Sequence, residues 1–168
     1  MGVLTPKHPD ILNEYYKQLE PTQNHVMRPE LQSVGNFLAY LIKTSTTRKV
    51  KVAKLENFTT RVIEVLQRHY RHRWHIEQPW KGSNYREIKI NPRARNPYIT
   101  KAANMADIKE KNLYRSLPAY VCIWIDPLQV TYRIGECGYE RWLFKQGNDS
   151  TNTAWEAKDG HGRLKLYF

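Results

Sequence analysis

The stretch "HYRHRWHIEQPW", residues 69–80, concentrates side chains that can do chemistry. Its histidines could bind a metal ion, its aromatic rings could stack on bases, and its arginines could contact phosphate. Tryptophan, tyrosine and arginine are also the residues that dominate binding in protein interfaces. The stretch alone therefore leaves three kinds of site open: a metal centre, an RNA-binding surface and a protein-docking surface.

A metal centre would be built from His69, His72 and His75. Positions 69 and 72 are three residues apart, so a helix would place them on one face. Zinc would still need further ligands to close its shell, and Cys122 and Cys137 come much later, on predicted strands. A simpler interpretation is that His69 ends the core stripe of a helix while the other two are solvated. We predict no metal site and no cofactor.

Catalytic motifs are absent from the sequence, which has no serine nucleophile elbow, no Walker loop, no dinucleotide-binding glycine pattern and no HExxH zinc motif. Asp126 and Glu136 flank one predicted hairpin and could form an acid–base pair. Asp126, however, stands directly before Pro127, where aspartate is an ordinary turn residue. We therefore predict a protein that is not an enzyme.

The chain is strongly basic, with 27 lysines and arginines, 16 aspartates and glutamates, and a formal net charge of +11. Between residues 68 and 95 cations alternate with aromatic residues, which suits single-stranded RNA because cations follow its phosphates and rings stack on its bases. The candidate phosphate contacts are Arg71, Arg73, Lys81 and Arg86. Composition alone does not separate this hypothesis from a solvated basic face over a core that contains some of the rings.

A protein-docking surface is suggested by "CIWID", residues 122–126. On a strand, Ile123 and Ile125 would face one side, while Trp124 and Asp126 would face the other. If the aliphatic side is the core, Trp124 is presented outward as an interface anchor. In the alternative both faces are covered and Trp124 belongs to the core.

Helices are expected in the first half of the chain. Apolar residues recur at helical spacing over 29–41 and 55–69, which predicts two amphipathic helices packed on each other. Two short helices are predicted between residues 91 and 118, the first opened by Pro97 and the second capped by Asp107.

Strands are expected mainly in the second half. "YREIKI" alternates so that Arg86, Ile88 and Ile90 share one side, and "YVCIWID", "QVTYRI" and "YERWLF" are β-rich runs separated by short turns. Helices followed by strands indicate the α+β class, with a helical layer packed on a small antiparallel sheet.

The chain divides into three parts by composition. We predict a loosely ordered extension over 1–28, one compact domain over 29–145 and a flexible polar tail over 146–168. No apolar run is long enough to span a bilayer and the N-terminus lacks a secretory pattern, so we expect an intracellular protein of the cytoplasm and nucleus without a membrane partner.

Two long motifs resemble a known family. "HYRHRWHIEQPWKGSNYREIKIN" is similar to box A of the BTG/Tob antiproliferative proteins, and "LYRSLPAYVCIWIDPLQVTYRIGECG" is similar to their box B. The resemblance runs from Glu30 to Phe144 and keeps the order and spacing of both boxes. It implies a compact α+β BTG/Tob-like domain, in agreement with the pattern of predicted elements.

The resemblance also implies a non-catalytic adaptor. Members of the family use the surface of boxes A and B to bind the Caf-type deadenylase subunit of the Ccr-Not complex, and so promote mRNA deadenylation and decay, repress translation and restrain proliferation. The family's interface positions fall on Tyr70, Trp124 and Asp126. His69 and Trp74 would shape this surface from beneath.

The chain departs from the family pattern after box B. In the shorter members the segment there contacts poly(A)-binding protein, but "GYERWLFK" differs from it, so we do not expect poly(A)-binding protein to bind here. Some nematode members act in germ-cell fate and self-assemble. The alternatives to a deadenylase adaptor are therefore a weak, direct RNA-binding module that uses residues 68–95, and a self-assembling scaffold.

Overall fold

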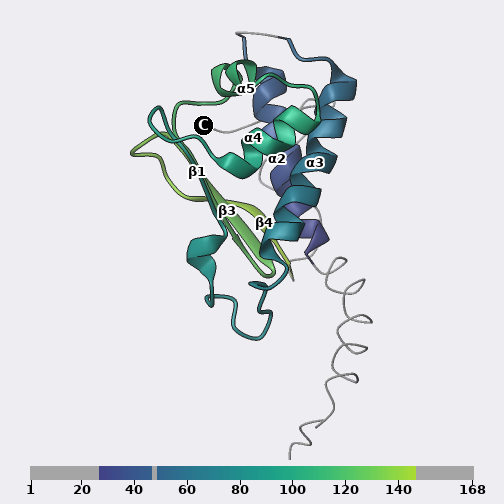
Figure 1. Ribbon diagram of the computed structural model, residues 1–168. Helices are drawn as coiled ribbons and strands as arrows, with labels where there is room; N and C mark the ends of the chain where they lie inside the picture. Colours follow the sequence, from purple (N-terminus) through teal and green to yellow (C-terminus); the bar gives the residue numbers. More distant parts are fainter. Residues whose placement is uncertain (1–26, 47–48, 147–168) are drawn as a thin grey trace, which may run out of the picture.

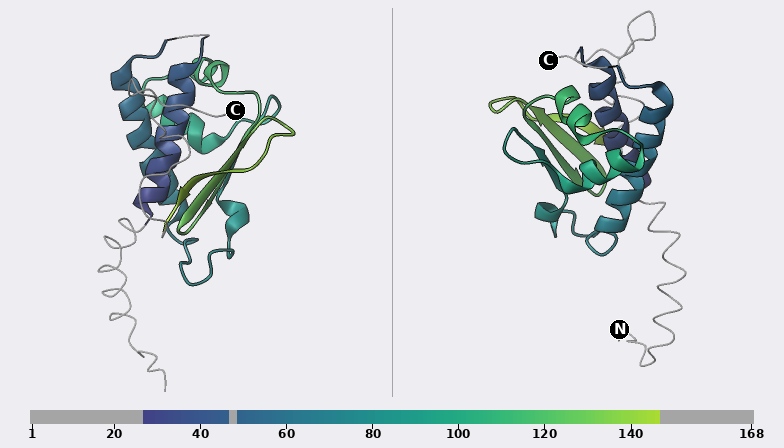
Figure 2. Two further views of the ribbon diagram at one scale, coloured as in Figure 1. Left: turned by 180° about the vertical axis from the view of Figure 1, so that it is seen from behind. Right: turned by 45° about the horizontal axis from the view of Figure 1, so that its top comes forward.

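The structure of the protein is a computed structural model that describes residues 27–46 and 49–146. Most of the extension predicted over 1–28 and most of the tail predicted over 146–168 lie outside these ranges; of the extension, Met27 is buried in the core and Arg28 begins α2. The elements in chain order are α2 Arg28–Thr44, α3 Val52–Tyr70, the 3₁₀ turn η1 Ser83–Tyr85, β1 Glu87–Ile90, α4 Pro97–Met105, α5 Glu110–Ser116, β2 Val121–Asp126, β3 Gln129–Ile134 and β4 Arg141–Lys145. The helices form a layer on one side of the sheet, which confirms the predicted α+β class (Figures 1 and 2).

The two long helices form the centre of the helical layer. Their apolar stripes are buried against each other, and Phe37, Phe58 and Leu66 are fully buried. Where α2 crosses α3, a side chain at Gly35 would lie 3.0 Å from the methyl group of Thr59 and 3.1 Å from its carbonyl oxygen. The absence of a side chain at Gly35 therefore lets the two helices approach closely and pack their larger residues on either side of the crossing.

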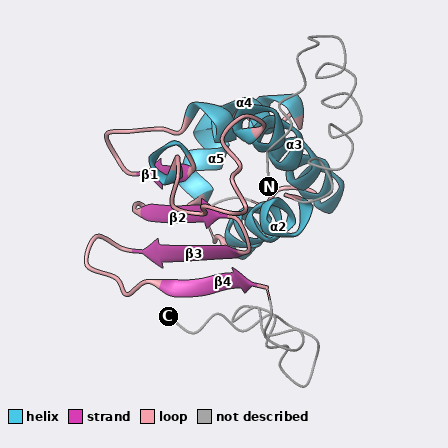
Figure 3. Ribbon diagram, turned by 90° about the horizontal axis from the view of Figure 1, so that it is seen from below, coloured by secondary structure: helices cyan, strands magenta, loops and turns pink. Residues whose placement is uncertain are grey.

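The sheet is antiparallel throughout, with the strand order β1-β2-β3-β4 (Figure 3). Alternate residues on β2 are buried under the helices, including Val121, Ile123 and Ile125. Helix α2 contacts β2, β3 and β4 on this side. The sheet thus has one face in the core and one face turned away from the helices, as an alternating apolar pattern demands.

Strand β4 contains a β-bulge opposite β3. Val130 pairs with Phe144, whereas its neighbour Thr131 pairs with Trp142, so Leu143 is the extra residue. Leu143 is fully buried, while Trp142 is 44% exposed. The bulge therefore decides which face of the sheet each β4 side chain occupies.

One local expectation was wrong. Asp107 does not cap α5, whose N-cap is Lys109. Asp107 instead adopts a left-handed backbone with φ 56° and its carboxylate pairs with the Lys54 ammonium on α3. The hydrogen bond and charge of Lys54 hold the pKa of Asp107 below its ordinary value. Capping rules consider only residues that are close in sequence, whereas the partner of Asp107, Lys54, lies on another helix.

A buried carboxylate joins the β2–β3 turn to the start of α2. Glu30 is 1% exposed, and its Oε1 accepts a hydrogen bond of 2.8 Å from the backbone N–H of Leu128, which has a φ of 71°. Its Oε2 is also buried, and among the described residues it has no hydrogen-bond partner. Burial accordingly raises the pKa of the Glu30 carboxyl above its ordinary value.

We expect this carboxyl to make stability depend on pH. With a folded-state pKa above the unfolded value of 4.5, the native protein binds the proton more tightly, so stability falls as pH rises from that value through the folded pKa. Glu30→Gln removes the titration and keeps the acceptor oxygen. Urea unfolding at several pH values should therefore show the variant gaining stability relative to wild type as pH rises. If the difference in free energy of unfolding between the two proteins does not change with pH, the raised pKa of Glu30 is contradicted.

Candidate protein-docking site

The side chain of Arg86 connects box A with box B. It is fully buried, and each of its five N–H donors has an acceptor. Its Nε donates to the Ile125 carbonyl at 2.8 Å, and its terminal nitrogens donate to the carbonyls of Arg73, Lys81 and Pro79 at 2.6, 2.8 and 2.5 Å. A single guanidinium therefore fixes the loop over residues 71–85 against the end of β2.

The fifth donor of Arg86 pairs with Asp126. The distance from its Nη2 to the Asp126 Oδ1 is 2.7 Å, and the carboxylate side chain is 21% exposed. Asp126 therefore compensates a buried positive charge, in addition to opening the turn that the sequence predicted. Only a minor part of this carboxylate is available to another molecule.

The loop over residues 71–85 folds around this guanidinium. Trp74 is 6% exposed, and the Arg86 guanidinium lies 5.7 Å from the centre of its ring. Gly82 has φ 76°, and a side chain there would lie 3.3 Å from the Arg86 Nη1. A glycine is suited to this place because the left-handed backbone disfavours other residues and the space is taken by the guanidinium.

Tyr70 does not provide the exposed contact surface that the resemblance suggested. It is the last residue of α3 and 1% exposed, and burial raises the pKa of its phenol well above the ordinary value. The positive charge of Arg86 opposes that rise in pKa, so Arg86 is close enough to Tyr70 to act on its phenol electrostatically. Tyr70 therefore supports the loop from below instead of presenting its ring to a partner.

Trp124 has the outward position that the alternation of "CIWID" predicted. Its neighbours Ile123 and Ile125 are buried in the core, while Trp124 is partly exposed on the opposite face of the sheet. The Arg133 guanidinium lies 5.6 Å from the centre of its ring. Of the residues carried over from the family, Trp124 is the aromatic side chain that the structure leaves accessible.

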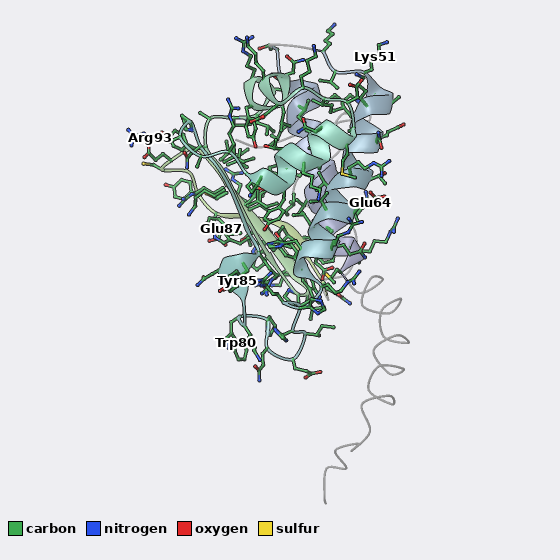
Figure 4. The ribbon with its side chains drawn as sticks, viewed as in Figure 1. Lys51, Glu64, Trp80, Tyr85, Glu87 and Arg93 are labelled. Atoms are coloured by element: carbon green, nitrogen blue, oxygen red, sulfur yellow. The ribbon has the colours of Figure 1, made fainter. Side chains whose placement is uncertain are left out.

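The candidate phosphate contacts separate into two groups. Arg86 was wrongly included, because it is fully buried and its donors are all used within the protein. Lys81 is exposed, whereas Arg71 and Arg73 are partly exposed, with the Arg73 guanidinium 4.6 Å from the centre of the Tyr85 ring. Figure 4 shows Tyr85 and Trp80 on this loop, on the side of the molecule away from Glu64 of α3.

His69 lies on the side of α3 that faces α4. Its ring stacks on Tyr98 of α4 at a centroid distance of 4.0 Å, beside a groove of about 290 Å³ between the two helices. Burial, assisted by the charge of Arg73, lowers the pKa of His69 below its ordinary value.

Within the described ranges no cluster of three potential metal ligands is present. The same part of the chain has no helix long and apolar enough to cross a membrane.

Sequence reasoning missed the structural role of Arg86 and the partner of Glu30. A signal for Arg86 was available, since alternation placed it on the same side as the core residues Ile88 and Ile90. A cation among core positions indicates a buried, fully bonded group. No comparable signal existed for Glu30, because its acceptor role depends on a turn at the other end of the domain.

Replacing Arg86 should unfold the loop and weaken the whole domain. Arg86→Lys offers three donors on a narrow head group, which cannot reach all five acceptors, and we expect a loss of about 3 kcal/mol or more in the free energy of unfolding. The same exchange at the exposed Arg93 is the matched control and should change stability by less than about 0.5 kcal/mol. Urea unfolding measures the stability of both variants. An Arg86→Lys variant as stable as wild type would contradict the role of Arg86.

Comparison with known proteins identifies the family. The BTG family matches residues 27–143. Protein BTG2 of Homo sapiens is 38% identical over 112 residues, which covers 67% of this chain and 69% of BTG2. Protein BTG1 of Homo sapiens is 35% identical, with 70% of this chain and 67% of BTG1 covered. Protein Tob1 of Homo sapiens is 31% identical over 73% of this chain, which corresponds to 34% of Tob1.

A solved structure supports the same fold. The BTG/Tob domain of C. elegans FOG-3 aligns with a TM-score of 0.58 and 21% identity, over 71% of this chain and 82% of that domain. The structural likeness agrees with the sequence matches, which place both boxes within the matched region. The chain therefore belongs to the BTG/Tob family of antiproliferative regulators.

Proposed function

We propose that this domain is a non-catalytic adaptor that docks the Caf-type deadenylase subunit of the Ccr-Not complex and so promotes mRNA deadenylation, decay and translational repression. The observation that supports it is the Arg86–Asp126 ion pair of 2.7 Å, which joins the two family motifs into one surface. Trp124 lies two residues before Asp126 on that surface, partly exposed. Tryptophan is among the residues most enriched in interface hot spots, and a partly exposed one is available to a partner.

The accessible aromatic residue should carry the binding. Trp124→Ala removes the ring from the open face without creating a cavity in the core, and we expect at least a roughly tenfold loss of affinity for the purified deadenylase subunit. Titration of that subunit into wild type and variant measures the change. Wild-type affinity in the variant, or no binding by wild type, would refute this assignment.

Tyr70 needs a variant that keeps the core intact. Tyr70→Ala would open a cavity and cost about 3–5 kcal/mol of stability, so lost binding would not reveal a contact. Tyr70→Phe keeps the buried ring, and we expect it to bind the deadenylase subunit like wild type. A strong loss in this variant would instead show that the hydroxyl contacts the partner.

A second candidate function is weak binding of single-stranded RNA by the loop over residues 71–85. Trp80 is 72% exposed and Tyr85 60% exposed, and Arg73 lies against the Tyr85 ring. Exposed rings beside cations are the elements of a stacking platform. This version of the hypothesis uses Arg71, Arg73 and Lys81 without Arg86.

The RNA hypothesis predicts a steep dependence on salt, because phosphate contacts release counterions. Trp80→Ala should weaken binding of a poly(A) oligoribonucleotide, while Tyr139→Ala, at an 86% exposed aromatic position outside the loop, should not. Fluorescence anisotropy at several salt concentrations tests both. Binding that is insensitive to salt and to Trp80→Ala would exclude this function.

A further inference from the structure

The face of the sheet that points away from the helices carries a row of paired residues. Glu87 on β1 pairs with Trp124 on β2, Trp124 pairs with Thr131 on β3, and Thr131 pairs with Trp142 on β4. Directly paired residues of an antiparallel sheet point to the same face. Both tryptophans therefore stand on the open face, with the small Thr131 between them.

The bulge in β4 is what brings Trp142 to this face. With regular pairing continued from Val130 and Phe144, Thr131 would face Leu143, and Trp142 would point toward the helices. The extra residue reverses this arrangement, so that Leu143 is fully buried and Trp142 is 44% exposed. Bulges often redirect a side chain next to a functional site, and this one places a large apolar ring on the open face.

Each tryptophan has a cation over its ring. The Arg133 guanidinium lies 5.6 Å from the Trp124 centroid, and the Lys145 ammonium lies 4.8 Å from the Trp142 centroid. Among the described residues neither cation forms a salt bridge with a carboxylate, and the buried Nε of Arg133 has no hydrogen-bond partner. The one carboxylate of the row, Glu87, pairs with Lys89 at 3.2 Å. The face thus has positive charge that lacks a counterpart within the domain.

We propose that the docking surface extends across the open face of the sheet, and that Trp142 is a second anchor which, with Trp124, receives an apolar side chain of an acidic protein surface. This inference rests on the proposed function, because the partner is the same deadenylase subunit. Paired strands lie about 4.8 Å apart, so the two anchors are separated by about 10 Å, enough for one side chain to lie over Thr131. Carboxylates of the partner pair with Arg133 and Lys145.

A protein surface fits this face better than RNA. RNA binding needs a series of cations that follow successive phosphates, whereas the row supplies one cation at each tryptophan. Cations held against aromatic rings can still pair with carboxylates of a protein partner through their remaining N–H donors. Aromatic residues and arginine are enriched in protein interfaces.

The test is a titration of the purified deadenylase subunit into the full chain. Trp142→Ala should weaken binding roughly tenfold or more, and Lys145→Glu should weaken it and reduce its dependence on salt. Tyr139→Ala, at an exposed aromatic position outside the sheet, is the matched control and should bind like wild type. Thermal melting of each variant verifies the fold, which an exposed side chain should leave unchanged.

The outcomes separate this inference from the proposed function. Loss of binding in Trp124→Ala with wild-type binding in Trp142→Ala and Lys145→Glu overturns the extension and leaves the adaptor function standing. Absence of binding by wild type refutes the adaptor function, and the extension with it. If Trp142→Ala weakens binding of a poly(A) oligoribonucleotide but not of the deadenylase subunit, the face is an RNA platform and the inference is wrong.

Discussion

The candidate surface depends on the buried guanidinium of Arg86. A charge removed from water is costly unless it is fully bonded, and here four carbonyls and one carboxylate satisfy its donors. The loop after α3 has no regular structure apart from η1, so its shape is defined by these bonds. Because Asp126 supplies the carboxylate, the loop and the end of β2 hold each other in position.

This arrangement changes how the family positions are interpreted. Asp126 and Tyr70 were expected to contact a partner, but Asp126 is mostly occupied by Arg86 and Tyr70 is buried. Substitutions at either position would act first on the shape of the surface. Trp124 differs because its surroundings keep it in place without covering it, so its loss removes contact area and little else.

Much of the fold followed from sequence patterns. The stripes of α2 and α3 and the alternation of β2 and β3 are local, and they predicted the elements and the buried side of each. Features that depend on distant partners were not predictable in this way. Alternation does not reveal a bulge, so nothing in "YERWLF" showed that Leu143 would turn toward the helices and Trp142 toward the open face, in the reverse of the regular pairing from Val130 and Phe144. Asp107 and Glu30 likewise have partners on other elements.

The bulge at Leu143 also affects the outer edge of the sheet. Strand β4 has a neighbour on one side only within the described sheet, and such an edge exposes backbone groups to which another chain could add a strand. An interrupted strand of five residues with basic residues at both ends, Arg141 and Lys145, is a poor template for that addition. The same irregularity that turns Trp142 outward thus favours contact through side chains on the face of the sheet over growth of the sheet from its edge.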